Sequence, residues 1–308
     1  MLKNIVSAKQ FDKATIEHIL ETADQVRSKN YDPNALSGKI MATLFYEPST
    51  RTRLSFESSM LRLGGGVIST ESAAEFSSAA KGETLEDTIR VVNAFSDVIV
   101  LRHFSAGASE IAQRYSRVPI VNAGDGNGEH PTQALLDLYT IFSKFSKRDI
   151  TIAMVGDLLN GRTIHSLSVF LALYPKIKLV YVSPEALAIP KTLRSHLKSK
   201  GIKFKETLDL NVALKTADVI YQTRIQKERF KNETDYVKFK GLYIIDKNSL
   251  KQLKKTSIIM HPLPRINEIT TDVDKDPRAV YFQQVQNGLY IRMSVLLYLF
   301  DKTSKKTR

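Results

Sequence analysis

Residues 40–57 read IMATLFYEPSTRTRLSFE, and this stretch passes from one kind of backbone structure into another. The apolar run 40–46 is typical of a buried strand, whereas Phe56, Met60 and Leu63 recur at helical spacing. Residues 49–53 therefore lie where a strand turns into a helix, beside free backbone amides and the positive end of the helix dipole. Arginine adds a fork of donors to these amides, and hydroxyl groups add further contacts. The stretch predicts an α/β unit with an anion-binding site.

For an isolated motif, a Ser or Thr N-cap followed by solvated arginines would be the simpler interpretation. Here the segment Ser49-Thr50-Arg51-Thr52-Arg53 gathers five hydroxyl or guanidinium side chains at one turn. That concentration favours binding of an anion.

Strand-like and helix-like segments alternate along the rest of the chain, as in parallel sheets with crossover helices. Besides strand 40–46, we expect strands at these places: near 67–68, 97–101, 118–121, 149–156, 178–182, 217–221 and 257–260. Helices are expected from Thr50, through Ile89, Val92 and Phe95, after His130, and near 289–299. The fold class is α/β, with two domains, each a parallel sheet flanked by helices, and a C-terminal helix that packs back on the first domain.

A chain of 308 residues suits two domains at ~100–200 residues each. We place one domain at residues 1–134, joined by a C-terminal helix at about 286–308, and the other at 135–285. Two polar segments, 71–83 and 226–241, read as long loops that could cover a site.

Composition narrows the class of protein. The chain has 43% hydrophobic residues, no cysteine and no apolar run of the ~18 residues that a membrane span needs. Its start lacks the apolar core of a signal peptide, so the cytoplasm is the default expectation. The net charge of +13 fits either polyanions or small anionic substrates. A nucleic-acid-binding protein is the alternative from another class, but no basic stripe interleaved with aromatic residues supports it.

Two further elements carry polar groups suited to a ligand. His130-Pro131-Thr132-Gln133 opens a long helix, with proline at the favoured first position, so His130 and Gln133 share a face. Arg102 follows strand 97–101, at the carboxyl end where open α/β sheets place ligands.

The second half has three comparable strand ends. Residues 155–163, VGDLLNGRT, form a glycine-bearing turn without the G-x-G-x-x-G of a dinucleotide site. Arg224 and Gln226 follow strand 217–221 and share one side if extended. His261-Pro262-Leu263-Pro264-Arg265 follows strand 257–260.

Taken together, these motifs resemble those of the aspartate and ornithine carbamoyltransferases, in family order and over nearly the whole chain. The resemblance implies transfer of a carbamoyl group from carbamoyl phosphate to an amino acid. It assigns the binding of carbamoyl phosphate to these residues: Ser49, Thr50, Arg51, Thr52, Ser77, Lys81, Arg102, His130, Gln133, Leu263 and Pro264. Of this set, Arg51, Thr52, Lys81, Arg102 and His130 are the expected catalytic residues.

The same resemblance assigns the amino-acid acceptor to Lys81, Arg162, Arg224 and Gln226, and domain closure to Glu47 and Arg229. Arg224 and Gln226 suit an anionic side chain, whereas the ornithine enzymes use an acidic and Ser-Met-Gly element for a cationic one. L-Aspartate is therefore the expected acceptor, and another acceptor such as ornithine is the alternative.

The resemblance also implies partners. Ser77 and Lys81 match a loop that reaches into a neighbouring subunit, so a homotrimer with shared active sites is expected. Small anionic substrates are the expected ligands, with no cofactor, no metal, no nucleic acid and no membrane. The sequence leaves open whether a separate regulatory chain binds.

Overall fold

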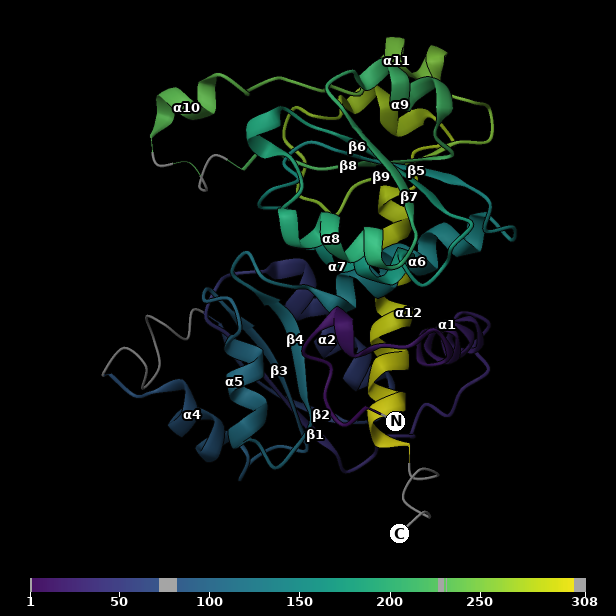
Figure 1. Ribbon diagram of the computed structural model, residues 1–308. Helices are drawn as coiled ribbons and strands as arrows, with labels where there is room; N and C mark the ends of the chain where they lie inside the picture. The colour runs from purple at the N-terminus through teal and green to yellow at the C-terminus, as the bar shows by residue number, and fades with distance from the viewer. Residues whose placement is uncertain (1, 72–81, 227–229, 231, 302–308) are drawn as a thin grey trace. The chain divides into compact units, whose positions relative to one another are not determined.

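The computed structural model describes residues 2–71, 82–226, 230 and 232–301. Its contacts divide the chain into two units, residues 1–139 with 286–308 and residues 140–285. Each unit contains one parallel sheet with helices on both faces (Figure 1).

The strands of the first unit are β1 (Ile40–Phe45), β2 (Gly66–Glu71), β3 (Val98–His103) and β4 (Ile120–Asp125). Their order in the sheet is β2-β1-β3-β4, and all neighbours are parallel. The helices associated with this unit are η1 (Ala8–Gln10), α1 (Lys13–Arg27), α2 (Thr50–Arg62), α4 (Leu85–Val92), α5 (Ala108–Tyr115), α6 (Pro131–Lys144) and α12 (Tyr281–Phe300). Both α6 and α12 continue into the second unit.

The two faces of the first sheet are covered by different helices. Apolar residues of β1 and β3, such as Ala42 and Ile99, pack with Ile89 of α4 and Ala112 of α5. Helices α1, α2 and α12 lie on the other side, as Figure 1 shows. The C-terminal helix thus packs on the first unit, as the sequence predicted.

The strands of the second unit are β5 (Thr151–Val155), β6 (Lys178–Val182), β7 (Lys203–Thr207), β8 (Val219–Gln222) and β9 (Ile258–Met260). Their order is β7-β6-β5-β8-β9, again all parallel. The helices are α7 (Arg162–Leu171), η3 (Glu185–Leu187), α8 (Lys191–Ser199), α9 (Leu210–Thr216), α10 (Glu233–Val237), α11 (Lys247–Gln252) and η5 (Thr271–Lys275).

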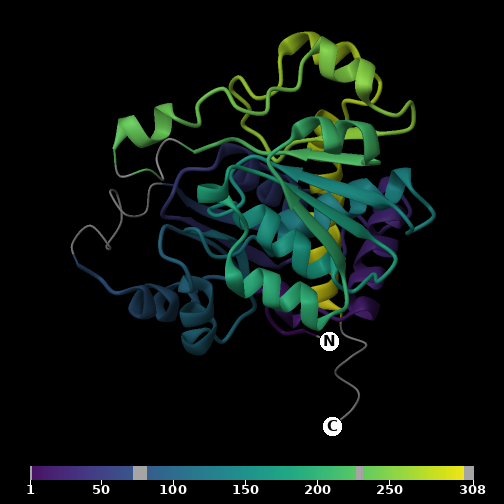
Figure 2. The same cartoon turned by 45° about the horizontal axis from the view of Figure 1, so that its top comes forward.

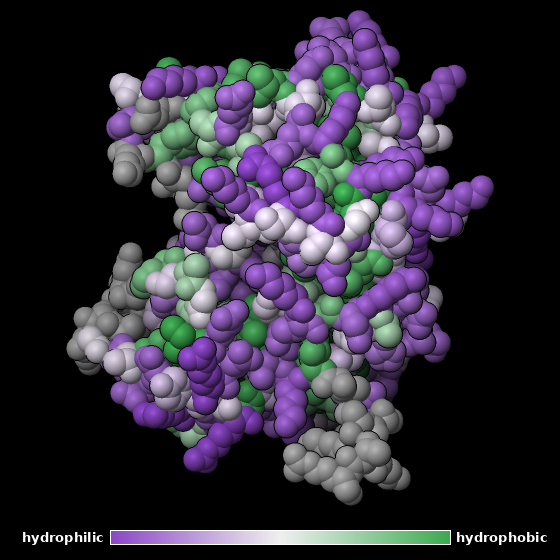
Figure 3. Space-filling model, in the orientation of Figure 1, coloured by the Kyte–Doolittle hydropathy of each residue, from purple (hydrophilic) through white to green (hydrophobic). Residues whose placement is uncertain are grey.

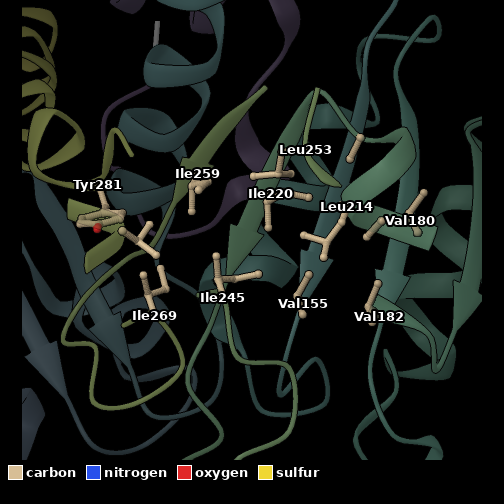
Figure 4. Close-up of a cluster of buried hydrophobic side chains, with 14 residues drawn as sticks. Val155, Val180, Val182, Leu214, Ile220, Ile245, Leu253, Ile259, Ile269 and Tyr281 are labelled. Carbon is tan, nitrogen blue, oxygen red and sulfur yellow. The ribbon is translucent and has the colours of Figure 1, made fainter. Parts of the chain in front are cut away.

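The core of the second unit lies between its sheet and α9. Strand residues Val155, Val180 and Ile220 point toward Leu214 of α9 (Figure 4). Helices α7 and α8 cover the opposite face of the sheet, which Figure 2 shows from a second direction. Both faces of the sheet are therefore buried, which accounts for the near-continuous apolar runs of its central strands.

Some predicted boundaries were wrong. The helix through Ile89 and Val92 does not reach Phe95. The amides of Ala94 and Phe95 donate to carbonyl groups three residues earlier instead of four, and Phe95 is exposed. Strand β4 starts two residues later than predicted and runs on to Asp125, while α12 starts eight residues earlier than 289.

Strand β7 was not predicted, since its sequence KFKET alternates lysine with other residues and it lies at the sheet edge. Charged side chains of this kind are typical of edge strands. In the face that Figure 3 shows, hydrophilic side chains predominate. Over the described residues, no helix is long and apolar enough to cross a membrane.

Candidate active site

The order of strands defines a ligand position in the first unit. After β1 the chain adds β2 on one side and then crosses to add β3 on the other. In open parallel sheets such a reversal leaves a crevice at the carboxyl ends of the two central strands. Here the segment 47–52 follows β1, and Arg102 stands near the end of β3, in register with Phe45. The predicted anion-binding loop, residues 47–52 (the anion loop), and Arg102 therefore both lie at the carboxyl ends of the strands.

The anion loop leaves the first turn of α2 available to a ligand. Ser49 occupies the N-cap position without a side-chain capping bond, and its hydroxyl donates instead to Oγ1 of Thr52 at 3.0 Å. Of the two arginines, Arg53 turns back to pair with Glu71 at 2.9 Å, whereas Arg51 is exposed. The first amides of α2, two hydroxyls and one guanidinium therefore gather at a helix N-terminus, an arrangement that suits a phosphate group.

Arg102 is buried and held on three sides. Its Nη2 donates to Oε2 of Glu47 at 2.6 Å and its Nε to the carbonyl oxygen of Glu47 at 3.2 Å. Nη1 donates to the carbonyl oxygen of Ala123 at 3.2 Å. These bonds fix the plane of the guanidinium at the carboxyl end of β3.

His130 and Gln133 follow the carboxyl end of β4. His130 is buried, and its carbonyl oxygen accepts from the amides of Gln133 and Ala134 at 3.1 Å each, which starts α6. The loop before it is closed by Asp125, whose carboxylate accepts from the amides of Gly107 and Glu129. His130 and Gln133 therefore lie at a helix start that these bonds fix. They follow β4, the strand next to β3, which carries Arg102.

The sequence interpretation missed His103. Its ring lies 4.7 Å from that of Tyr46, and its Nδ1 accepts from the amide of Ser105 at 3.0 Å. Burial lowers the pKa of His103, so the ring is neutral at neutral pH. Its position directly after Arg102 was the only available signal. The contacts make it a support for the two loops beside the site.

The second unit has its own reversal of strand order, between β5 and β8. Thr223 joins the two strand ends, since its amide and hydroxyl both donate to the carbonyl oxygen of Val155, at 2.8 and 2.9 Å. Gly156 follows with φ +119, and a Cβ there would lie 2.4 Å from the Thr223 carbonyl oxygen. Only glycine allows this close approach.

Three predicted acceptor residues follow the strands at that reversal. Arg162 is the first residue of α7, and the turn before it is closed by buried Asp157, which accepts from the amide of Asn160 at 3.0 Å. Burial raises the pKa of Asp157. Arg224 follows β8, and it lines a pocket of this unit together with Tyr236, Lys240 and Glu268. Gln226 is half-buried two residues further on.

The backbone at Leu263 and Pro264 is fixed by a buried pair. Nδ1 of His261 accepts from the amide of Leu263 at 2.8 Å, while Nε2 lies 2.9 Å from Oε1 of Glu268. Burial acts to raise the pKa of Glu268, but the bond to His261 and bonds from backbone amides outweigh it and hold that pKa below its usual value. Leu263 takes the left-handed conformation, with φ +56.

The predicted residues thus fall into two groups. Glu47, Ser49, Thr50, Arg51, Thr52, Arg102, His130 and Gln133 belong to the first unit, while Arg162, Arg224, Gln226, Leu263 and Pro264 belong to the second. Ser77, Lys81 and Arg229 lie outside the described residues. Within the part of the chain that the structure describes, no cluster of three or more His, Cys, Asp or Glu side chains could hold a metal ion.

Comparison with protein families defines the class. Residues 3–143 match the carbamoyl-phosphate-binding domain of the aspartate/ornithine carbamoyltransferases, and residues 148–299 match their Asp/Orn-binding domain. The chain belongs to the aspartate/ornithine carbamoyltransferase family.

Individual relatives narrow the comparison to the aspartate branch. The chain is 52% identical to the chloroplastic aspartate carbamoyltransferase of Arabidopsis thaliana, over 97% of this chain and 78% of that protein. Among solved structures, the catalytic subunit of M. jannaschii aspartate transcarbamoylase is 48% identical, with a TM-score of 0.89 over 98% of this chain and 99% of that one. The Trypanosoma cruzi aspartate transcarbamoylase in complex with carbamoyl phosphate and aspartate is 42% identical, with a TM-score of 0.89 over 95% of each chain.

Proposed function

We infer that this chain is an enzyme that transfers the carbamoyl group of carbamoyl phosphate to the α-amine of L-aspartate. The products are N-carbamoyl-L-aspartate and phosphate, and the reaction belongs to pyrimidine biosynthesis. The observation that carries this inference is the similarity of nearly the whole chain to aspartate carbamoyltransferases, with both family domains matched in order.

The first unit would hold carbamoyl phosphate. The amides at the start of α2, with Ser49, Thr50, Arg51 and Thr52, bind the phosphate oxygens by charge-assisted hydrogen bonds. Arg102, His130 and Thr52 polarise the carbonyl oxygen, as the donors of an oxyanion hole do. Gln133 binds the amino group of the carbamoyl moiety. Support for this assignment comes from the meeting of these residues at the ends of β1, β3 and β4.

The second unit would hold aspartate. Arg162 binds one carboxylate, and Arg224 with Gln226 binds and orients the other, while backbone carbonyl groups at Leu263 and Pro264 contact the substrates. Arg224 and Lys240, two of the residues that line this pocket, support an anionic acceptor. Glu47 and Arg229 would link the two units when both substrates are bound.

The uncharged amine of aspartate attacks the carbonyl carbon, the new C–N bond forms and the bond from that carbon to the phosphate oxygen breaks. No carboxylate among the assigned residues serves as the base, so a phosphate oxygen of the substrate accepts the amine proton. Holding two anions in reacting geometry in a cationic site accounts for much of the rate.

Acceptor choice is tested by phosphate release with L-aspartate, L-ornithine and N-acetyl-L-ornithine in separate reactions. Aspartate alone should support rapid release. Faster release with ornithine would contradict the assignment of Arg224 and Gln226 to an anionic side chain.

We also propose a homotrimer in which Ser77 and Lys81 complete the site of a neighbouring copy. Lys81→Ala and Arg51→Ala are each expected to be inactive, and a refolded mixture of the two should recover part of the activity. No recovery after verified subunit exchange would contradict shared sites.

Two further properties are proposals of the same kind. The relative from M. jannaschii is named a catalytic subunit, which supports a separate regulatory chain for this protein as well. We propose the cytoplasm as its compartment, since a chain without cysteine cannot form the disulfides that stabilise proteins of oxidising compartments.

A further inference from the structure

Arg292 carries a guanidinium into the interior of the first unit. It lies on α12, is 4% exposed, and its Nε has no hydrogen-bond partner among the described residues. Burial lowers the pKa of Arg292 to about 10, while the charge of Asp137 acts in the opposite direction. The side chain is therefore a cation at neutral pH, and a buried cation requires a nearby anion.

Arg292 lies where α12 packs against α2 and α6, the two helices that begin at the proposed carbamoyl phosphate site. Its guanidinium carbon lies 5.0 Å from the ring centroid of Phe56 on α2. One turn earlier on α12, a Cβ at Gly288 would lie 2.7 Å from Nη1 of Arg292 and 3.2 Å from Leu136 of α6. Gly288 thus makes room for the guanidinium at the point where α12 meets α6.

Phe56 and Asp137 each lie one helical turn after a proposed substrate-binding residue. Phe56 is four residues after Thr52 on α2, and Asp137 is four residues after Gln133 on α6. Residues at this spacing share a helix face. On α6 the connection is direct, because Nε2 of Gln133 donates to Oδ1 of Asp137 at 2.9 Å.

The direction of this bond decides which end of the Gln133 amide meets a substrate. An amide has one donor end and one acceptor end, and an ionised carboxylate accepts only. With Nε2 committed to Asp137, the carbonyl oxygen Oε1 is the end that remains for a ligand. An acceptor at this place suits the NH₂ of a carbamoyl group and disfavours an oxygen of a carboxylate.

We propose that Asp137 and Arg292 are positioning residues that set the specificity of the donor site for a carbamoyl group over a carboxylate of the same shape. Asp137 holds the Gln133 amide with its acceptor end toward the substrate, and Arg292 keeps Asp137 ionised while bracing Phe56 below Thr52. The inference rests on the proposed function, since that function places Gln133 against the carbamoyl amine.

The test compares two probes, phosphonoacetamide and phosphonoacetate, which differ by NH₂ against O⁻. Their dissociation constants, measured by calorimetry on the full chain, give an amide-to-carboxylate preference. Asp137→Asn should lower this preference about tenfold, because Asn can donate to Oε1 and turn the Gln133 amide over; that is ~1.4 kcal/mol. Inorganic phosphate, which does not reach Gln133, should bind with its wild-type affinity.

Arg292→Met separates positioning from simple charge effects. This variant removes the cation that stabilises the ionised carboxylate of buried Asp137, and a protonated carboxyl group can donate to Oε1, so the amide preference falls here too. Simple electrostatics predicts opposite shifts, because one variant removes a negative charge and the other a positive one. Arg292→Lys keeps the charge and should keep the preference within about twofold. Exposed Arg62→Met is the matched control and should leave it unchanged.

Shifts of opposite sign in Asp137→Asn and Arg292→Met, or a wild-type preference in both, would overturn the inference. If Arg292→Met does not fold, inorganic phosphate makes the distinction, because a simple charge effect of Asp137→Asn would raise its affinity as well, whereas loss of positioning changes only the amide-to-carboxylate preference. Wild-type protein that binds phosphate but neither phosphonate would refute the proposed donor site itself. Wild-type protein that binds both phosphonates while its variants do not change would refute the positioning role alone.

Discussion

Glu47 and Arg102 form a two-point contact, in which Arg102 donates to the Glu47 carboxylate at 2.6 Å and to its carbonyl oxygen at 3.2 Å. The arginine side chain is 10% exposed and that of Glu47 is 33% exposed. The carboxylate therefore occupies an edge of the guanidinium that the proposed mechanism needs for substrate oxygens. Domain closure through Arg162 and Arg229 would require Glu47 to leave Arg102.

Removing this carboxylate should separate binding from turnover. Glu47→Gln removes an anion that competes with phosphate for Arg102, so the affinity for inorganic phosphate should rise about threefold. Turnover should fall, because the neutral side chain would lose the pairing with Arg162 and Arg229 that we propose for domain closure. Phosphate calorimetry and steady-state rates measure the two effects, with exposed Glu17→Gln as the control. A joint fall of affinity and turnover would instead mean that Glu47 serves to hold Arg102 in place.

Arg224 should act on the acceptor alone. A charge-assisted hydrogen bond contributes about 1.5–3 kcal/mol, so Arg224→Ala should lose at least roughly tenfold in kcat/KM for aspartate. The affinity for inorganic phosphate should not change. Arg224→Lys keeps the charge but loses the planar fork of donors. Its kcat/KM for aspartate should therefore lie between those of the wild type and Arg224→Ala. Wild-type kinetics in Arg224→Ala would disprove the assignment.

Gly156 should be intolerant of a side chain. In Gly156→Ala the new Cβ would meet the Thr223 carbonyl oxygen, so the ends of β5 and β8 must separate. We expect a loss of roughly 2 kcal/mol or more in the free energy of unfolding, together with weaker aspartate binding. Gly201→Ala is the matched control, because Gly201 also has positive φ but nothing lies within 4 Å of its Cβ position. Urea unfolding compares them, and equal losses would mean that backbone strain alone matters.

The ionised carboxylate of Glu268 should make the stability of the second unit depend on pH. Its folded-state pKa lies below the usual 4.5, so its contribution to stability is fully present above pH 4.5 and is lost as the pH falls through the folded value. Glu268→Gln should therefore be less stable than wild type at pH 7, and the difference should shrink as the pH falls below 4.5. Unfolding curves at several pH values measure it. A difference that does not depend on pH would mean that the ionised carboxylate does not supply the stability.

Local sequence was sufficient for much of the site. The strand-to-helix turn at 49–52 and the helix start at His130 have patterns within a few residues, and the structure places them as predicted. Arg102 likewise lies at the end of a buried strand. Local patterns decide such features because caps, dipoles and apolar periodicity act over one or two helical turns.

Contacts between distant segments could not be predicted in this way. The pairing of Glu47 with Arg102 depends on β1 lying next to β3, and nothing within either segment encodes that order. Arg292 was a single charge in an apolar helix, and its role depends on where α2 and α6 pack. The exposed edge strand β7 escaped notice because it buries too little apolar surface to show a pattern.

Direct observation of the new bond tests the central claim most closely. Carbamoyl phosphate labelled with ¹³C and L-aspartate labelled with ¹⁵N are incubated with the enzyme and followed by NMR. Transfer to the α-amine predicts a ¹³C signal split by one-bond coupling to ¹⁵N, growing with the enzyme concentration and absent with Arg51→Ala. Carbon signals without that splitting, while phosphate is released at the same rate, would show hydrolysis or another acceptor and would contradict the account.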